Sequence, residues 1–332
     1  MDIYNHLINC KSNLLKYFGK KNICFLDIET TGLSRKYNQI YLIGMVYFDE
    51  NNKNWCLKQI FANNTDQEKQ ILEKLNNIIN QFDLIVTYNG ISFDLPFIHH
   101  RCKKHSIHSK ILDMNSFDIY REIKNHSSYI QLENLRLKTV EEKLGIYRED
   151  EYSGKDCINF YYQYMKNKDE VLKNRILKHN YDDLYYLMDI MKIFDHIRDI
   201  KSTVVDYNGK IINIEIKDII ASEDILKISC TTSTVDDYVD AIYYQGGFNI
   251  DWRGDNSLVI DLEFKEGLIT PTKKCLFLYK ADIPYSKDLN DLSQFIVPDN
   301  IILLKVEDKY EVENIKNILK HLIQYVLLEQ DK

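Results

Sequence analysis

Residues that interrupt regular structure are scarce in this sequence of 332 residues. It has four prolines and eleven glycines, too few for the long flexible linkers that such residues usually form. No run approaches the roughly 18–20 apolar residues of a membrane-spanning helix, and the first residues lack the long apolar segment of a signal peptide. We therefore expect packed domains and no membrane partner.

Cysteine pairs are missing as well. The seven cysteines are an odd number, and no two have the C-x-x-C spacing of a zinc or redox site. This pattern argues against a disulfide framework or a zinc knuckle, and it fits a reducing compartment. We expect a cytoplasmic protein.

Positive charge is not in excess, although nucleic-acid-binding proteins often have a basic face. The formal net charge is -7. Residues 1–200 hold 28 Lys and Arg against 27 Asp and Glu, whereas residues 201–332 hold 15 against 23. Any basic face must therefore be local and belong to the first part. The acidic second part is a poor candidate for gripping nucleic acid.

The length suits two domains, and 45% apolar with 28% charged residues is ordinary for a globular protein. The run at 23–29 is apolar on both faces, which is typical of a central strand covered on both sides. Strands that alternate with amphipathic helices indicate an α/β fold. In residues 1–200 we expect strands at 23–29, 40–48, 54–61 and 83–88, and helices at 1–20, 67–80, from about Ser92, 133–144, 154–167 and 169–197.

The composition shifts near residue 200, where we place the domain boundary. Asn208-Gly209 lies between two alternating apolar runs, which is a strong hairpin signal. Residues 201–332 are predicted to form a smaller, strand-rich α+β domain that ends in an amphipathic helix at 309–329. Its further strands are expected at 225–230, 241–251, 257–264, 275–280 and 301–306.

Asp27 and Glu29 are the first candidates for chemistry. They lie two residues apart at the end of the apolar strand, so both side chains point to one face of the sheet. Two carboxylates in such surroundings repel each other and lose hydration, and a bound Mg²⁺ or Mn²⁺ would compensate. The alternative is a pair of exposed acids at a strand end.

Asp94 follows the strand 83–88 across a turn that contains Asn89-Gly90. If this strand is a parallel neighbour of strand 23–29, Asp94 reaches the same sheet edge as Asp27. Asn89-Gly90 indicates a tight turn and a close approach of the backbone. Alternatively, Asp94 is a structural aspartate that complements the dipole of a helix first turn.

The helix predicted at 169–197 supplies the third set of candidates. With about 100° per residue, Asp183 falls beside the apolar stripe of this helix, whereas Asp182 falls nearly opposite and should face solvent. His179 lies four residues before Asp183 and so on the same face. A surface histidine is the simpler interpretation of His179 taken alone.

Three segments together resemble a known family. FLDIETTGL (25–33), YNGISFDLPF (88–97) and HNYDDL (179–184) are similar to the three motifs of DEDD-superfamily exonucleases, which have a ribonuclease H-like fold. The match is closest to the bacterial YprB-like group of predicted exonucleases, and it covers about residues 20–197. LKTVEEKLG (137–145), with Arg148 soon after, resembles the linking region of that group.

The resemblance implies a ribonuclease H-like mixed sheet flanked by helices. It also implies a 3′→5′ exonuclease that hydrolyses DNA or RNA by a two-metal mechanism. Asp27, Glu29, Asp94 and Asp183 match the family's metal-binding acids, so two Mg²⁺ or Mn²⁺ ions are the expected cofactors and the 3′ end of a nucleic acid is the expected partner. His179 is the candidate general base.

His179 departs from the two common patterns of the family. Proofreading-type members place a Tyr four residues before the last Asp, and histidine-type members place a His five residues before it. Here a His stands at the tyrosine spacing, as in the YprB-like group. A shift of one residue turns a helical side chain by about 100°, so the role of His179 is less defined than those of the acids.

Two further segments leave alternatives open. The basic stretch His99–Lys104, followed by His105, His108 and Lys110, could contact phosphates, hold a soft metal or be a solvated helix face. Residues 201–332 match no motif, and a protein partner is favoured over substrate binding or dimerisation. For the whole chain, the alternative to a nuclease is an adaptor of the same fold that binds nucleic acid or protein without hydrolysis.

Overall fold

The structure, a computed structural model, describes residues 1–9, 13–148, 152–234, 240–254 and 256–331. The chain forms two compact units. The first comprises Met1–Asn125 and Leu132–Ile193, and the second comprises His126–Gln131 and Phe194–Lys332. Among the described residues, no helix is long and apolar enough to cross a membrane.

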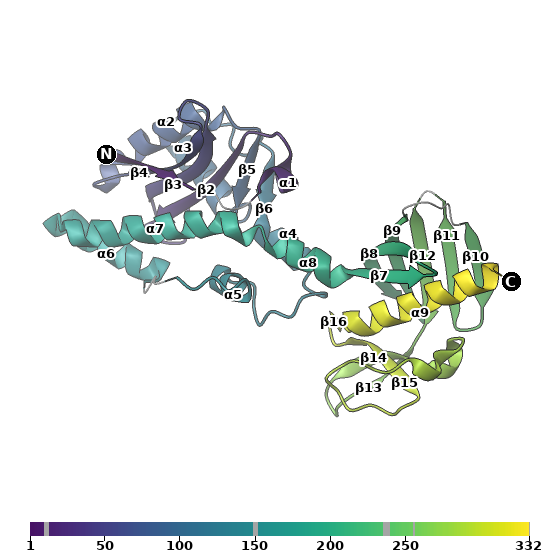
Figure 1. Cartoon of the computed structure of the whole chain (residues 1–332). Coiled ribbons are helices and arrows are strands. Elements are labelled where there is room, and N and C mark those ends of the chain that lie inside the picture. The colour runs from purple at the N-terminus through teal and green to yellow at the C-terminus, as the bar shows by residue number, and fades with distance from the viewer. Residues whose placement is uncertain (10–12, 149–151, 235–239, 255, 332) are drawn as a thin grey trace. The chain divides into compact units, whose positions relative to one another are not determined.

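The first unit is built on a six-stranded mixed sheet (Figure 1). Its strands are β1 (Asp2–Ile8), β2 (Ile23–Thr30), β3 (Ile40–Asp49), β4 (Asn54–Phe61), β5 (Leu84–Thr87) and β6 (Ser116–Asp118). Their order is β1-β4-β3-β2-β5-β6, with β5 parallel to both β2 and β6 and the other pairs antiparallel. Nearly every residue of β2 is buried, which confirms the prediction of a central strand covered on both faces.

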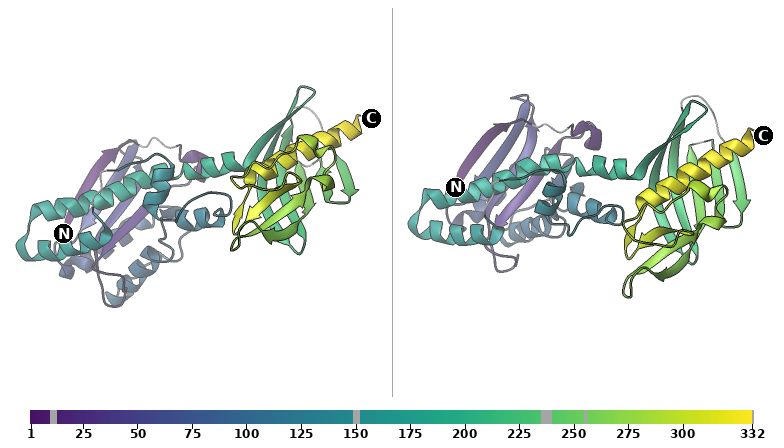
Figure 2. Two further views of the ribbon diagram at one scale, coloured as in Figure 1. Left: turned by 90° about the horizontal axis from the view of Figure 1, so that it is seen from below. Right: turned by 60° about the horizontal axis from the view of Figure 1, so that its bottom comes forward.

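Helices flank this sheet, as Figures 1 and 2 show. They are α1 (Leu15–Phe18), α2 (Glu68–Ile79), α3 (Asp94–Lys104), α4 (Ile119–Asn125), α5 (Leu137–Lys143), α6 (Gly154–Asn167) and α7 (Glu170–Ile190). The long helix α7 contacts β2, β3 and β4, and α6 packs along α7. The apolar stripe predicted for this helix, which includes Leu184, Leu187 and Met188, is buried.

The helix predicted at 1–20 is wrong. Residues 2–8 form the edge strand β1, which pairs antiparallel with β4, and among the described residues of this stretch only Leu15–Phe18 is helical. The sequence hides this strand because an edge strand is held by backbone hydrogen bonds to one neighbour and needs no alternating apolar face. Leu7, a residue of this strand, is 63% exposed.

The second unit contains two antiparallel sheets and a long helix. The first sheet joins β10 (Ala241–Gln245), β11 (Phe248–Arg253), β12 (Ser257–Glu263), β9 (Ile225–Thr234), β8 (Lys210–Ser222) and β7 (Ser202–Tyr207) in that order. The second joins β13 (Lys265–Leu268), β14 (Lys274–Tyr279), β15 (Ile301–Val306) and β16 (Lys309–Tyr310). Helix α9 (Val312–Gln330) packs against β7 and β15 (Figures 1 and 2).

These elements confirm the predicted fold class, a mixed sheet with flanking helices followed by a strand-rich α+β part. The predicted hairpin turns at Asn208 and Gly209, which both have positive φ. The single strand expected at 241–251 is instead a hairpin of β10 and β11, because the chain reverses at Gly246-Gly247. The helix expected to continue to 197 ends at Ile190, and α8 (Ile193–Lys201) follows.

Candidate active site

Asp27 and Glu29 lie near the carboxyl end of β2. Asp27 is half-buried, and Glu29 is 8% exposed. The Tyr41 hydroxyl on β3 donates to Glu29 Oε2 over 3.5 Å. Both acids therefore occupy positions where the surrounding core removes water from them.

Asp94 reaches β2 from the neighbouring strand. Strands β2 and β5 are parallel neighbours, which is the condition for Asp94 to reach the same sheet edge as Asp27, and their pairing ends at Phe25. Further along β2 the backbone N–H of Ile28 donates to Asp94 Oδ1 over 3.1 Å. Asp94 is the first residue of α3, the helix that was predicted to begin at about Ser92, and its N-cap Phe93 has no capping hydrogen bond. The carboxylate of Asp94 is thus held at Ile28, the residue of β2 that lies between Asp27 and Glu29.

Asp118 holds the turn that leads to Asp94, and the sequence reasoning missed it. Its buried carboxylate accepts hydrogen bonds from the backbone N–H groups of Asn89 (2.8 Å) and Ile91 (3.1 Å). Asn89 has a φ of 62°, and a Cβ on Gly90 would lie 2.5 Å from Thr87 Cβ. The tight turn and close backbone approach predicted for Asn89-Gly90 are confirmed. A lone aspartate at the end of a three-residue strand gives no signal for this role.

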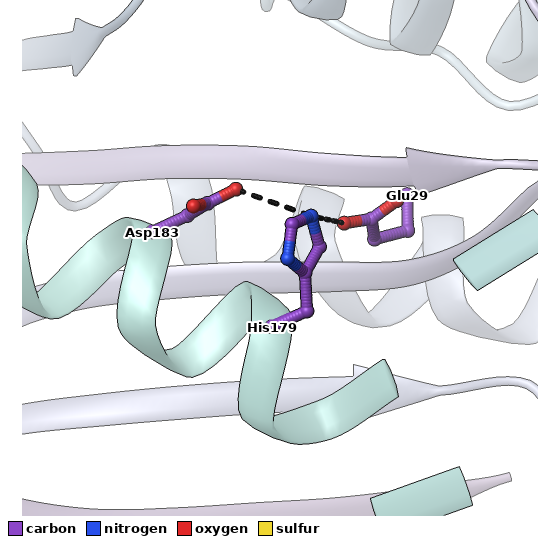
Figure 3. A group of neighbouring side chains, drawn as sticks. All are labelled: Glu29, His179 and Asp183. Carbon is purple, nitrogen blue, oxygen red and sulfur yellow. Dashed lines mark ion pairs between the residues drawn. The ribbon is translucent and has the colours of Figure 1, made fainter. Parts of the chain in front are cut away.

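Helix α7 brings His179 and Asp183 to Glu29. His179 Nε2 lies 3.7 Å from Glu29 Oε1 and 3.6 Å from Asp183 Oδ2. Figure 3 shows the imidazole of His179 between the two carboxylates. Ligand atoms of these three residues lie within 4.8 Å of one another, close enough to share a cation.

Asp182 is not exposed to solvent, so that prediction is wrong. Its side chain is 12% exposed and forms an ion pair with Lys178, whereas the side chain of Asp183 is 21% exposed. Helix α7 contacts α5 and α6 as well as the sheet. A residue that points away from the sheet can therefore still be buried.

Two buried amides orient Asp27, and neither was found from the sequence. Asn180 Nδ2 donates to Asp27 Oδ2 over 2.7 Å, and Asn180 Oδ1 accepts from Gln59 Nε2 over 2.9 Å. Gln59 Nε2 also donates to the Leu177 carbonyl over 2.8 Å. Because Gln59 offers a donor, Asn180 must present its own oxygen to Gln59 and its NH₂ group to Asp27.

Gly44 lets α7 approach the sheet at this point. It lies on β3, opposite Asp27 of β2 on one side and opposite Gln59 of β4 on the other. A Cβ at position 44 would lie 2.3 Å from Asn180 Oδ1 and 2.4 Å from Leu184 Cδ1. The missing side chain therefore creates the space that Asn180 occupies.

Arg148 contacts the acid cluster from the segment that follows α5. Its Nε lies 3.0 Å from Glu141 Oε2, and its guanidinium also pairs with Asp183. Glu141 is 1% exposed. The guanidinium thus neutralises a buried carboxylate and one carboxylate of the candidate site at the same time.

The carboxylates of the cluster are hard to ionise together. Burial, followed by the charges of Asp94, Asp183 and Glu29, raises the pKa of Asp27 well above its usual range. Burial raises the pKa of Glu29 to about 8, although His179 lowers it. Burial also raises the pKa of Asp94 to about 7. Buried oxygen ligands whose charges oppose one another fit hard divalent cations such as Mg²⁺ and Mn²⁺.

Comparison with known proteins places this site in a family. The sequence pattern of the RNase H superfamily matches residues 24–194, which is more than half of the chain. The chain belongs to the RNase H superfamily. The matched residues include all three segments that contribute to the acid cluster of this RNase H superfamily domain.

Three solved structures illustrate distant similarity to this superfamily member. A family B DNA polymerase from Pyrobaculum calidifontis is 13% identical, with a TM-score of 0.43 over 55% of this chain and 25% of that chain. E. coli ExoI in a complex with single-stranded DNA is 11% identical, with a TM-score of 0.33 over 64% and 54%. A product-bound exonuclease I is 10% identical, with a TM-score of 0.34 over 64% and 58%.

The chain thus spans between 25% and 58% of the length of these three proteins. A comparison with curated protein sequences gave no significant match.

Proposed function

We propose that the chain is a metal-dependent nuclease of the DEDD type, related to the YprB-like group, that hydrolyses phosphodiester bonds of DNA or RNA. The observation that carries this proposal is the convergence of four carboxylates from three separate segments. The charges of Asp94, Asp183 and Glu29 all act on Asp27. Such a cluster is costly to bury unless a cation compensates it.

Asp27, Glu29, Asp94 and Asp183 are the proposed metal ligands. The chemistry that two Mg²⁺ or Mn²⁺ ions supply is activation of the attacking water and stabilisation of charge on the leaving 3′ oxygen. Asn180 holds Oδ2 of Asp27 by a hydrogen bond and leaves its other oxygen for a ligand. His179 Nε2, placed between Glu29 and Asp183, is the proposed acceptor for the proton of the water.

The direction of hydrolysis, 3′→5′, rests on the motif resemblance. For residues 201–332 we propose a protein partner rather than nucleic acid, because they hold 23 acidic against 15 basic side chains. Hydrolysis is assigned to the first unit, because all four proposed metal ligands lie in it.

Digestion of 5′-labelled single-stranded DNA and RNA with Mn²⁺, Mg²⁺ or EDTA tests the proposal. The wild type is compared with Asp183→Asn, and Asp182→Asn is the matched control because it changes the adjacent acid. We expect a metal-dependent ladder that shortens from the 3′ end. Asp183→Asn should lower the rate by about 10³ or more, whereas Asp182→Asn should retain activity. If neither oligonucleotide is cleaved with either metal, the chain is a non-hydrolytic adaptor.

A further inference from the structure

The loop between β2 and β3 is held by hydrogen bonds between its own residues. At its base, the Thr31 N–H donates to the Gln39 carbonyl over 2.8 Å, and the Gln39 N–H donates to Thr31 Oγ1 over 2.9 Å. Inside the loop, Asn38 accepts from the Ser34 N–H over 3.0 Å and donates to the Thr31 carbonyl over 3.3 Å. The hydrogen bonds thus fix the loop at both its base and its interior.

The tip of this loop presents an aromatic ring and two cations to solvent. Tyr37 is 76% exposed, and Arg35 and Lys36 are exposed beside it. Lys36 Nζ lies 5.2 Å from the centre of the Tyr37 ring. A flat ring with adjacent positive charge is the combination that binds single-stranded nucleic acid, since bases stack on the ring and phosphates meet the cations.

Helix α3 adds positive charge next to the loop. The buried Arg101 guanidinium donates to the Arg35 carbonyl over 3.5 Å, which joins the last turns of α3 to the loop. Lys103 and Lys104 are exposed on the same part of α3. Burial and then the charges of Arg101, Arg35, Lys104 and Lys103 lower the pKa of His100, so these cations lie within electrostatic reach of it.

Arg101 itself is an anchor. Its guanidinium forms a two-bonded ion pair with Glu68, and both side chains are fully buried. Glu68 Oε1 also accepts from the Ile40 N–H over 2.8 Å at the start of β3. Through Arg101 and Glu68, the loop is therefore connected to α2, α3 and the sheet.

We propose that Arg35, Lys36, Tyr37, Lys103 and Lys104 form a surface that binds single-stranded nucleic acid, called here the loop–α3 patch. A base stacks on Tyr37, and the four cations contact phosphates of the same strand. The choice of nucleic acid rests on the proposed function, since the loop begins at Thr31, two residues after Glu29. A single strand is favoured over a duplex because stacking requires an unpaired base with a free face.

The structure argues against one interpretation of the basic stretch at His99–Lys104, the soft-metal site. A soft-metal site does not assemble there among the described residues, because Cys102 is 1% exposed and His105 Nε2 lies 2.7 Å from Glu68 Oε2. Arg101 has a structural role. The exposed Lys103 and Lys104 are the members of the stretch that can reach phosphate.

Fluorescence anisotropy with labelled single-stranded DNA and RNA, measured in EDTA at several salt concentrations, tests the patch without hydrolysis. Tyr37→Ala should weaken binding roughly tenfold, whereas Tyr37→Phe should bind like the wild type. Tyr244→Ala is the matched control, because Tyr244 is 75% exposed in the second unit. Equal affinities for Tyr37→Ala, Tyr244→Ala and the wild type would overturn the role of Tyr37.

The salt dependence tests the cations. For a single strand, each phosphate contact contributes about 0.7 to the slope of log affinity against log salt concentration. The double variant Lys103→Gln/Lys104→Gln should lower this slope by about 1.4. The control is Lys20→Gln/Lys21→Gln, an exposed adjacent pair elsewhere in the first unit, which should leave it unchanged. Equal slopes for both pairs would assign the patch to another partner, such as an acidic protein surface.

The same oligonucleotides separate this proposal from the proposed function. Cleavage by a protein whose patch variants bind normally would overturn the patch and leave the nuclease proposal standing. Patch-dependent binding by both the wild type and Asp183→Asn, without cleavage by either, would support the patch and overturn the nuclease proposal. Absence of binding to any oligonucleotide would overturn the patch.

Discussion

Asn180 donates a hydrogen bond of 2.7 Å from its side-chain amide to Asp27 Oδ2. The orientation of this amide is set by Gln59, which donates to Asn180 Oδ1 over 2.9 Å. Asn180 and Gln59 are 0% and 1% exposed, so water does not replace these bonds. The pair therefore fixes a carboxylate that we assign to metal binding.

Replacement of Asn180 by Leu removes the donor and keeps a side chain of similar size. We expect affinity for Mn²⁺ to fall about 10- to 100-fold, because groups that orient a ligand usually contribute that much. Isothermal titration calorimetry measures the affinity directly. Asn167→Leu, which changes the last residue of α6, serves as the control. Unchanged Mn²⁺ affinity in Asn180→Leu would show that the amide has only a packing role.

Gly44→Ala should destabilise the first unit. The added methyl group would lie 2.3 Å from Asn180 Oδ1 and 2.4 Å from Leu184 Cδ1, both in the buried interior. Overpacking of this kind costs roughly 1–3 kcal/mol in free energy of unfolding. Urea denaturation measures it, with Gly154→Ala as the control because a Cβ there meets nothing within 4 Å. Equal stability of the two variants would contradict the close approach of α7.

The stability of the metal-free protein should fall as pH rises. The pKa of Glu29 is raised to about 8 and that of Asp94 to about 7. At pH values between the usual carboxyl pKa and these raised values, the folded state therefore binds more protons than the unfolded state. The loss of folding stability that comes from ionising these two buried acids is absent near pH 4 and complete above about pH 8. Thermal unfolding in EDTA at about pH 5, 7 and 9 measures this trend.

Divalent metal should reverse this trend, since metal displaces the extra protons from the acids. The gain in melting temperature on adding Mn²⁺ should therefore increase from about pH 5 to 9. A gain that stays constant with pH would mean that Glu29 and Asp94 do not titrate with metal binding.

His179→Gln should slow hydrolysis by about 10²–10⁴, the usual contribution of a general base. Its nitrogen lies between the carboxylates of Glu29 and Asp183, so loss of the imidazole also removes a partner of both. Single-turnover cleavage of a labelled oligonucleotide measures the rate. His108→Gln is the control, because His108 is exposed on the same unit. A wild-type rate in His179→Gln would assign proton transfer to another group.

The features that the sequence predicted are those encoded in local patterns. The doubly apolar run gave β2 its central place, and the apolar stripe of α7 placed Asp183 rather than Asp182 beside the sheet. The prediction that Asp182 faces solvent was wrong, because an apolar stripe shows which side of a helix meets the sheet and does not show which other elements, such as α5 and α6, contact the helix.

Features that depend on tertiary contact could not be predicted. Asp118 caps a turn that lies 27–29 residues earlier in the chain, and Gln59 meets Asn180 across 121 residues. Each is a common polar residue without a local motif. The role of Gly44 could not be predicted either, because only the packing of α7 shows why a Cβ is excluded at that position.

The number of Mn²⁺ ions bound per chain tests the central claim most directly. Calorimetric titration at about pH 8, where the acids can ionise, should give two ions for the wild type and for Asp182→Asn. Asp183→Asn should lose at least one ion or bind it at least tenfold more weakly. If the wild type binds no Mn²⁺, or if Asp183→Asn binds it as the wild type does, the four carboxylates are not a metal centre.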